Sequence, residues 1–68
     1  MLTQKEKIVL SVLKKLIKQD IKPSMRVMRV ELAKRGLKIK SNNSLCQYYN
    51  QLQLKGYIKI IPYHIKIL

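Results

Sequence analysis

The feature that most limits the fold of this chain is a change in the spacing of its apolar residues at Gly56. Before Gly56 the apolar residues recur every three or four positions, which is typical of one face of an α-helix. After Gly56 apolar and polar residues alternate and β-branched residues dominate, which favours strands. A chain of 68 residues has room for one small domain. We therefore expect helices followed by a short hairpin, in a single domain over residues 1–68.

The first helix is expected over residues 3–19. Thr3 and Glu6 have the spacing of a capping box, in which each side chain satisfies a backbone N–H group at the helix start. A broad apolar face is expected to pack inward, and its members are Ile8, Val9, Val12, Leu13, Leu16 and Ile17. The lysines of this helix lie on the opposite side, where we expect a solvated face.

Two further helices are expected before Gly56. Ser24 is a good N-cap for a helix from Met25 or Arg26 to Arg35, and Gly36 suits its C-terminal end. A short connection over residues 37–40 leads to Ser41, which is the N-cap expected for a third helix. That helix covers residues 42–55, and its expected inward face consists of Leu45, Tyr49 and Leu52.

The alternating segment after Gly56 predicts a two-stranded hairpin. Lys59 and Lys66 point to one face, and we expect the isoleucines of the other face to pack on the first and third helices; these are Ile58, Ile60, Ile65 and Ile67. Residues 62–64 are expected to form the connection, because proline cannot donate to a strand ladder. Leu54 lies off the inward face of the third helix, and we expect it to cover the junction with the hairpin.

Several classes of protein are excluded by the residue types present. One cysteine, Cys46, and one histidine, His64, form neither a disulfide framework nor a zinc site. There is no pair of carboxylates and no Ser/His/Asp arrangement, so we expect no enzyme, no metal or other cofactor, and no small-molecule ligand. The apolar runs are shorter than the ~18 residues of a membrane span. The first residues lack a signal-peptide core, so we expect a cytoplasmic protein, in the host cytoplasm if the origin is viral or plasmid.

The charge of the chain indicates a polyanionic partner. Fifteen lysines and arginines face three acids, which gives a net charge of +12. Such an imbalance destabilises a compact state by self-repulsion unless a partner neutralises it. Nucleic acid is the commonest partner of this kind, followed by an anionic membrane surface. We expect no membrane partner, because the helices carry cap signals and share one core face. Against this background, residues 41–56 contain a single charged residue, Lys55, and many Asn, Gln and Ser side chains.

The order of these segments and several short motifs resemble a known family. The stretches "ELAKRG" and "SNNSLCQYYNQLQLKGYIKI" resemble the winged helix-turn-helix of small prokaryotic, archaeal and viral transcription regulators. The likeness is greatest to the DNA-binding domain of LexA-type repressors, on three motifs: Leu2-Thr3, Pro23-Ser24 and the segment from Leu52 to Ile58. The resemblance implies an α+β fold, a three-helix winged helix-turn-helix with a C-terminal two-stranded hairpin.

This chain departs from the family at three places. The likeness covers the DNA-binding domain of such repressors and not the protease domain that follows it, so self-cleavage is not carried over. The segment "SMRVMRV", which leads into the second helix, is longer than usual. The hairpin tip is shorter than the family's wing, so deep contact of the wing with the minor groove is not carried over either.

The resemblance implies which side chains meet double-stranded DNA. The third helix would enter the major groove, where Asn and Gln pair with adenine and neighbouring groups grip phosphate. The residues expected at base edges are Asn43, Ser44, Gln47 and Asn50. The residues expected at phosphates are Lys38, Lys40, Ser41, Asn42, Tyr48, Gln51, Lys59, Tyr63 and His64. Ser41 and Asn42 suit helix capping equally well, and the two roles are compatible.

Other readings of the same features stay open. A basic winged helix also serves as a protein-protein interaction module within a larger nucleoprotein assembly. Binding of RNA or single strands is a third reading, although only four tyrosines are available for stacking. The amides themselves can reflect an AT-rich genome. On DNA we expect a homodimer, because one small module contacts few base pairs, and the first helix or the C-terminal strand edge are the candidate surfaces.

Overall fold

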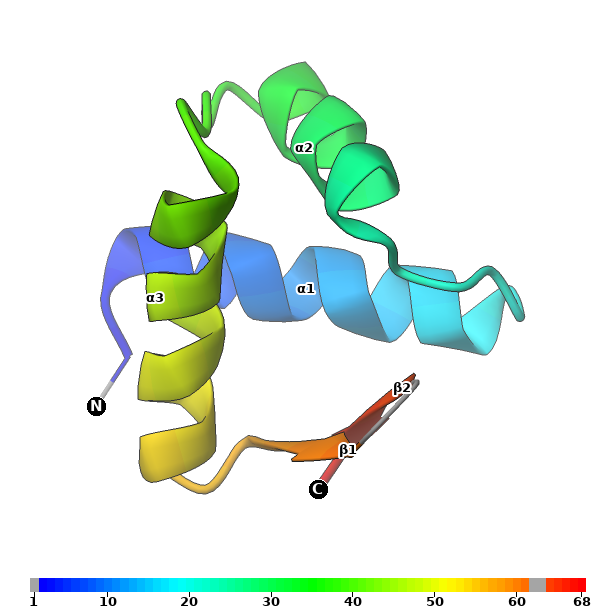
Figure 1. The fold of residues 1–68 in the computed structure, drawn as a ribbon. Helices are drawn as coiled ribbons and strands as arrows, with labels where there is room; N and C mark the ends of the chain where they lie inside the picture. Colours follow the sequence, from blue (N-terminus) through cyan, green and yellow to red (C-terminus); the bar gives the residue numbers. More distant parts are fainter. Residues whose placement is uncertain (1, 62–63) are drawn as a thin grey trace.

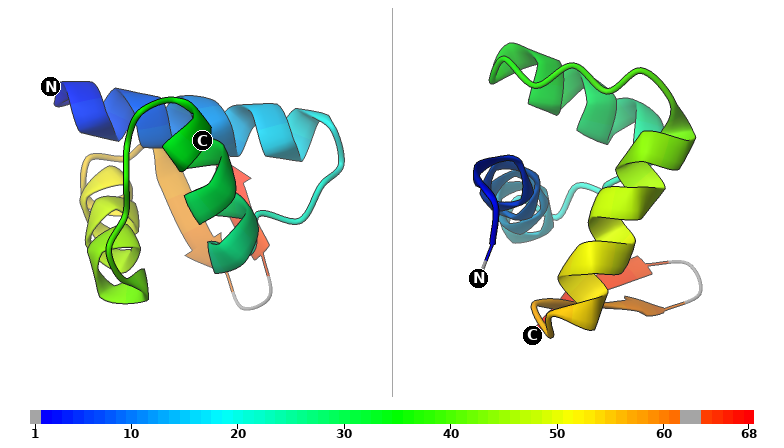
Figure 2. Two further views of the ribbon diagram at one scale, coloured as in Figure 1. Left: turned by 90° about the horizontal axis from the view of Figure 1, so that it is seen from above. Right: turned by 90° about the vertical axis from the view of Figure 1, so that its left-hand side faces the viewer.

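The computed structural model describes residues 2–61 and 64–68. Three helices precede a two-stranded antiparallel sheet: α1 (Gln4–Lys18), α2 (Met25–Lys34), α3 (Asn42–Leu54), β1 (Ile58–Ile61) and β2 (His64–Ile67) (Figure 1). α1 runs through the middle of the molecule, α3 crosses its N-terminal half, and α2 and the hairpin lie on opposite sides of it (Figures 1 and 2). This is an α+β arrangement with the layout of a winged helix, as the sequence predicted.

Each helix begins at the residue that the sequence predicted as its cap. The Thr3 N–H donates to Glu6 Oε1 at 3.0 Å, and the Glu6 N–H donates to Thr3 Oγ1 at 3.2 Å, which completes the capping box. Ser24 Oγ accepts from the backbone N–H of Val27 at 3.3 Å. The hydroxyl of Ser41 caps α3 in the same way. These bonds satisfy N–H groups that have no partner within the helix.

The ends of α2 and α3 lie at glycines. Gly36 has φ +86° and Gly56 has φ +84°, and both follow the last helical turn. This left-handed conformation is strained for residues with a Cβ atom, which explains why glycine stands at both positions. The change of period that the sequence shows at Gly56 therefore coincides with a real change from helix to strand.

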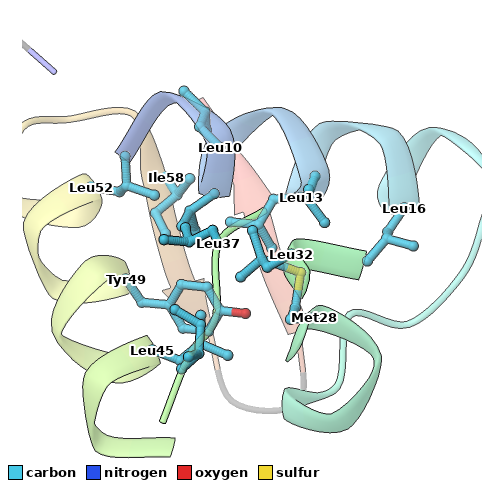
Figure 3. Packing of buried hydrophobic residues seen from close by; sticks show 13 residues of the cluster. Leu10, Leu13, Leu16, Met28, Leu32, Leu37, Leu45, Tyr49, Leu52 and Ile58 are labelled. Carbon is cyan, nitrogen blue, oxygen red and sulfur yellow. The ribbon is translucent and has the colours of Figure 1, made fainter. Parts of the chain in front are cut away.

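The core lies where the three helices and the foot of the hairpin meet. Its buried hydrophobic members are Val9, Leu10, Val12, Leu13, Leu16, Met28, Leu32, Leu37, Ile39, Leu45, Tyr49, Leu52 and Ile58 (Figure 3). Leu37 and Ile39 come from the connection between α2 and α3, which the sequence analysis treated as a link without a role in packing. Since burial alternates along this connection, with Lys38 and Lys40 exposed, the segment packs like a strand on the helices.

One prediction for α1 was wrong. Ile17 was expected in the core but is 36% exposed, and Leu10, for which the sequence analysis made no prediction, is 6% exposed. Ile17 lies in the last turn of α1, where its groove partners Ile21 and Ile65 are themselves incompletely covered. The apolar face of α1 is therefore broader than predicted at Leu10 and loses cover in the last turn of the helix.

The hairpin packs on the core through fewer residues than predicted. Ile58 is 1% exposed, and Ile65 and Ile67 are half-buried against the core, but Ile60 is 42% exposed. Ile60 lies two residues nearer the hairpin tip than Ile58. Its backbone N–H donates a hydrogen bond of 2.8 Å to Gln53 Oε1 of α3. Leu54 is 79% exposed, so it does not cover the junction as predicted, because it lies off the buried face of α3.

Candidate nucleic-acid interface

The face of α3 that points away from the core carries uncharged amides. α3 buries Leu45, Tyr49 and Leu52, and successive helical positions differ by about 100°. Asn43, Gln47 and Asn50 therefore lie on the opposite face, and all three are exposed. Three of the four residues predicted at base edges thus form one row on the outer side of this helix.

The fourth predicted base-contact residue, Ser44, lies on the flank of α3. It is half-buried, and its backbone N–H donates to Ser41 Oγ at 3.3 Å. The flank faces the N-terminus of α1 across a groove of about 450 Å³, which is lined by Thr3, Glu6, Ser44, Gln47, Tyr48, Gln51 and Lys55. The structure therefore brings most of the predicted contact residues of α3 together, but on two adjoining faces.

An ion pair that the sequence did not indicate closes one end of this groove. Lys55 Nζ donates to both carboxylate oxygens of Glu6, at 2.9 and 3.1 Å. The hydrogen bond from Lys55, followed by that from the Thr3 backbone N–H, lowers the pKa of Glu6 to about 2, although burial of the carboxylate works in the opposite direction. The single cation of the amide-rich segment is therefore engaged within the fold, and it joins the end of α3 to the start of α1.

Exposed cations lie at the start of α3. Lys38 and Lys40 are exposed on the connection that precedes the helix, and both line a groove that also includes Asn42. The positive end of the helix macrodipole lies at the same place. Ser41 has its side chain engaged as the N-cap, which confirms the capping role; Asn42 is exposed. This end of α3 is thus positive through side chains and backbone together.

A second pair of cations lies on the hairpin. Lys59 of β1 is directly opposite Lys66 of β2, and both side chains are exposed. Like charges at opposed positions destabilise a hairpin unless a counter-ion or ligand lies between them. The sequence analysis assigned Lys59 to phosphate and made no assignment for Lys66, which the register of the hairpin places directly beside it.

Some predicted residues fall outside the described part of the chain. Tyr63 lies there, and so does the side chain of His64, so their predicted phosphate contacts stay predictions. Among the tyrosines that the structure describes, Tyr49 is 4% exposed and its pKa is raised by burial, whereas Tyr48 is half-buried at the groove. Cys46 is exposed on α3.

Searches of the described residues found neither a metal-binding group nor a membrane span. No cluster of three or more His, Cys, Asp or Glu side chains that could hold a metal ion occurs in residues 2–61 and 64–68. No helix in that part of the chain has the length and apolar character needed to cross a bilayer. Comparison with protein-family models, with curated proteins and with solved structures found no match to the chain.

Proposed function

We propose that this protein is a sequence-specific, double-stranded DNA-binding transcriptional regulator of the winged helix-turn-helix type, with α3 in the major groove. The observation that carries the proposal is the contrast between two surfaces. The outer row of α3 has neutral amides at Asn43, Gln47 and Asn50, whereas exposed lysines lie at the start of α3 and on the hairpin. Base edges are neutral patterns of donors and acceptors, and phosphates are anions, so each surface suits one part of a duplex.

The engagement of Lys55 strengthens this division of roles. A free cation on α3 would attract phosphate from any sequence and would weaken discrimination. Lys55 instead bonds to Glu6, so the predicted base-reading helix presents no free charge of its own along that flank. The grip on phosphate is assigned to Lys38, Lys40 and the Lys59–Lys66 pair, with Ser41, Asn42, Tyr48 and Gln51 as neutral contributors.

Duplex DNA is favoured over single strands because few aromatic rings are available for stacking. Tyr49 is buried, Tyr48 is half-buried, and Tyr57 is 38% exposed. Single-strand binders use several exposed rings along a groove. The net charge of +12 also favours a long polyanion over a protein partner alone. Regulation of transcription by such a domain would need no catalytic group and would take place in the cytoplasm.

A homodimer on DNA follows from the small size of the predicted footprint. α3 offers one row of three amides, which is enough for a few base pairs but short of a specific site. Two copies on half-sites about one helical turn apart would supply the rest. Selection of bound duplexes from a random pool should therefore return a repeated half-site, and a selected site with no repeat, bound by one protein, would contradict the dimer.

The experiment that tests the function is a fluorescence anisotropy titration. The selected duplex, a random duplex and a single strand of the selected sequence are each titrated at several salt concentrations. We expect tight binding to the selected duplex, weaker binding to the random duplex by about 10³-fold or more, and a steep loss with salt. Equal affinity for single strand and duplex, or no preference for the selected sequence, would reject the proposal.

A further inference from the structure

A groove next to α2 is distinct in character from the amide-bearing face of α3. It has a volume of about 970 Å³ and lies between α2 and the connection that precedes α3. Its apolar lining comes from Met25, Val30, Ala33 and Ile39. Val30 is 51% exposed, so the apolar strip of the groove is open to a partner.

Four cations surround this apolar lining. Arg26 and Arg29 stand on α2, Lys38 and Lys40 stand on the connection, and all four side chains are exposed. No acidic side chain is among the described residues that line the groove. The groove thus combines a strip of apolar surface with an uncompensated positive rim.

The connection beside the groove is extended but lies outside the sheet. Burial alternates from Leu37 to Lys40 as in a strand, yet this segment belongs to neither strand of the sheet. Within the described part of the chain, the N–H groups of residues 38–40 donate no backbone–backbone hydrogen bond. A partner in extended conformation can pair with such a segment, which gives affinity through the main chain and specificity through alternate side chains.

We propose that this groove binds an acidic segment of a partner protein in extended conformation. Alternate apolar side chains of the segment would cover Val30 and its neighbours, and the acidic side chains between them would meet the arginines and lysines of the rim. Phosphates alone would meet the rim but would leave the apolar strip in water. The strip therefore favours a peptide as the occupant, and because Lys38 and Lys40 are also assigned to phosphate in the proposed function, peptide and duplex would compete for these two lysines.

A second copy of this chain does not fit the groove. The sequence has three acids, and two of them, Glu6 and Glu31, are already in ion pairs with Lys55 and Lys34. The third, Asp20, stands between Gln19 and Ile21 with lysines on both sides in sequence and supplies no acidic segment. Since each copy has a net charge of +12, the positive groove of one copy would repel a second copy.

The test uses two fluorescein-labelled peptides and two variants. One peptide alternates Val and Glu, and the control peptide alternates Ser and Glu with the same charge. Val30→Glu places an acid on the apolar strip, and Leu54→Glu makes the same change in charge at an exposed leucine that does not line the groove. Both positions are exposed on helices, so circular dichroism should show that both variants fold.

Binding is followed by anisotropy at about 150 mM salt, which screens long-range attraction. We expect the Val/Glu peptide to bind at least about tenfold more tightly than the Ser/Glu peptide. Val30→Glu should weaken the Val/Glu peptide by about tenfold, and Leu54→Glu by about twofold or less. Equal binding of the two peptides, or equal losses in the two variants, would show attraction by net charge only and overturn the proposal. For duplex binding the control is Gln19→Glu, which makes the same change in charge at an exposed residue just after α1, because Leu54 lies on the outer face of α3. Loss of duplex affinity by Val30→Glu, by as large a factor as its loss of peptide affinity and without a matching loss in Gln19→Glu, would assign the groove to nucleic acid and overturn the proposal as well.

Discussion

The ammonium group of Lys55 lies 2.9 and 3.1 Å from the two carboxylate oxygens of Glu6, 49 residues away in sequence. Glu6 also accepts the backbone N–H of Thr3, so one buried carboxylate both caps α1 and holds the end of α3. The ion pair therefore adds to the core packing of α3 in setting the angle between α3 and α1. In the proposed function that angle decides how α3 meets the major groove.

The free energy of unfolding should decrease as the pH is lowered through the range where Glu6 takes up a proton. The pKa of Glu6 is lowered from 4.5 to about 2 in the folded state, so the unfolded chain binds the proton first as pH falls. The contribution of the carboxylate is complete above pH 4.5 and is lost between pH 4.5 and 2. Urea unfolding at a series of pH values measures it. Glu6→Gln should be less stable at pH 7 and show a smaller loss on acidification, while Glu31→Gln should follow the parent; an equal acid loss in Glu6→Gln would contradict this role.

The two isoleucines on the inward face of β1 should differ in their effect on stability. Ile58 is 1% exposed, so Ile58→Ala should reduce the free energy of unfolding by about 2–5 kcal/mol, which includes the cavity it leaves. Ile60 is 42% exposed, so Ile60→Ala should cost less than half as much. Denaturant unfolding of both variants at pH 7 measures the difference. Equal losses would mean that the hairpin packs through both residues, against the arrangement described.

Removal of one hydroxyl from the core should leave the domain as stable or make it more stable. Tyr49 lies among the apolar side chains of the core (Figure 3). Its Oη atom is buried and, within the described part of the chain, has no hydrogen-bond partner. A buried polar group without a partner costs about 1–3 kcal/mol, which Tyr49→Phe would recover in whole or in part. Thermal unfolding of Tyr49→Phe, with Tyr48→Phe at the rim as the control, measures the effect. A clear loss of stability in Tyr49→Phe alone would show that its hydroxyl is bonded.

The parts of the fold that depend on neighbouring residues could be predicted from the sequence. Thr3, Ser24 and Ser41 cap the helices, and Gly36 and Gly56 end two of them, because each of these effects acts within one turn of chain. The row of amides on α3 was predictable in the same way, since helical spacing alone fixes which positions lie opposite the core.

What could not be predicted depends on residues far apart in sequence. Nothing in "LTQKEK" indicates that Glu6 would meet Lys55, because their distance follows from how α3 crosses α1. The exposure of Ile60 could not be predicted for a similar reason. Strand alternation shows on which face of the hairpin a residue lies, but not how much of that face the helices cover. The packing of residues 37–40 was missed because four residues are too few to separate a strand from a linker by pattern.

The proposed function rests on a separation of roles between Gln47 and Lys40, which are both exposed. Anisotropy titrations of Gln47→Ala, Lys40→Ala and the control Lys14→Ala, each with the selected and a random duplex over a salt series, test it most directly. Gln47→Ala should lose about 1–3 kcal/mol on the selected duplex and little on the random one. Lys40→Ala should weaken both duplexes alike and make the salt slope shallower by about one, whereas Lys14→Ala, on the solvated face of α1, should change neither. If Gln47→Ala weakens both duplexes equally, or if Lys40→Ala leaves the slope unchanged, the amides of α3 do not read sequence as proposed.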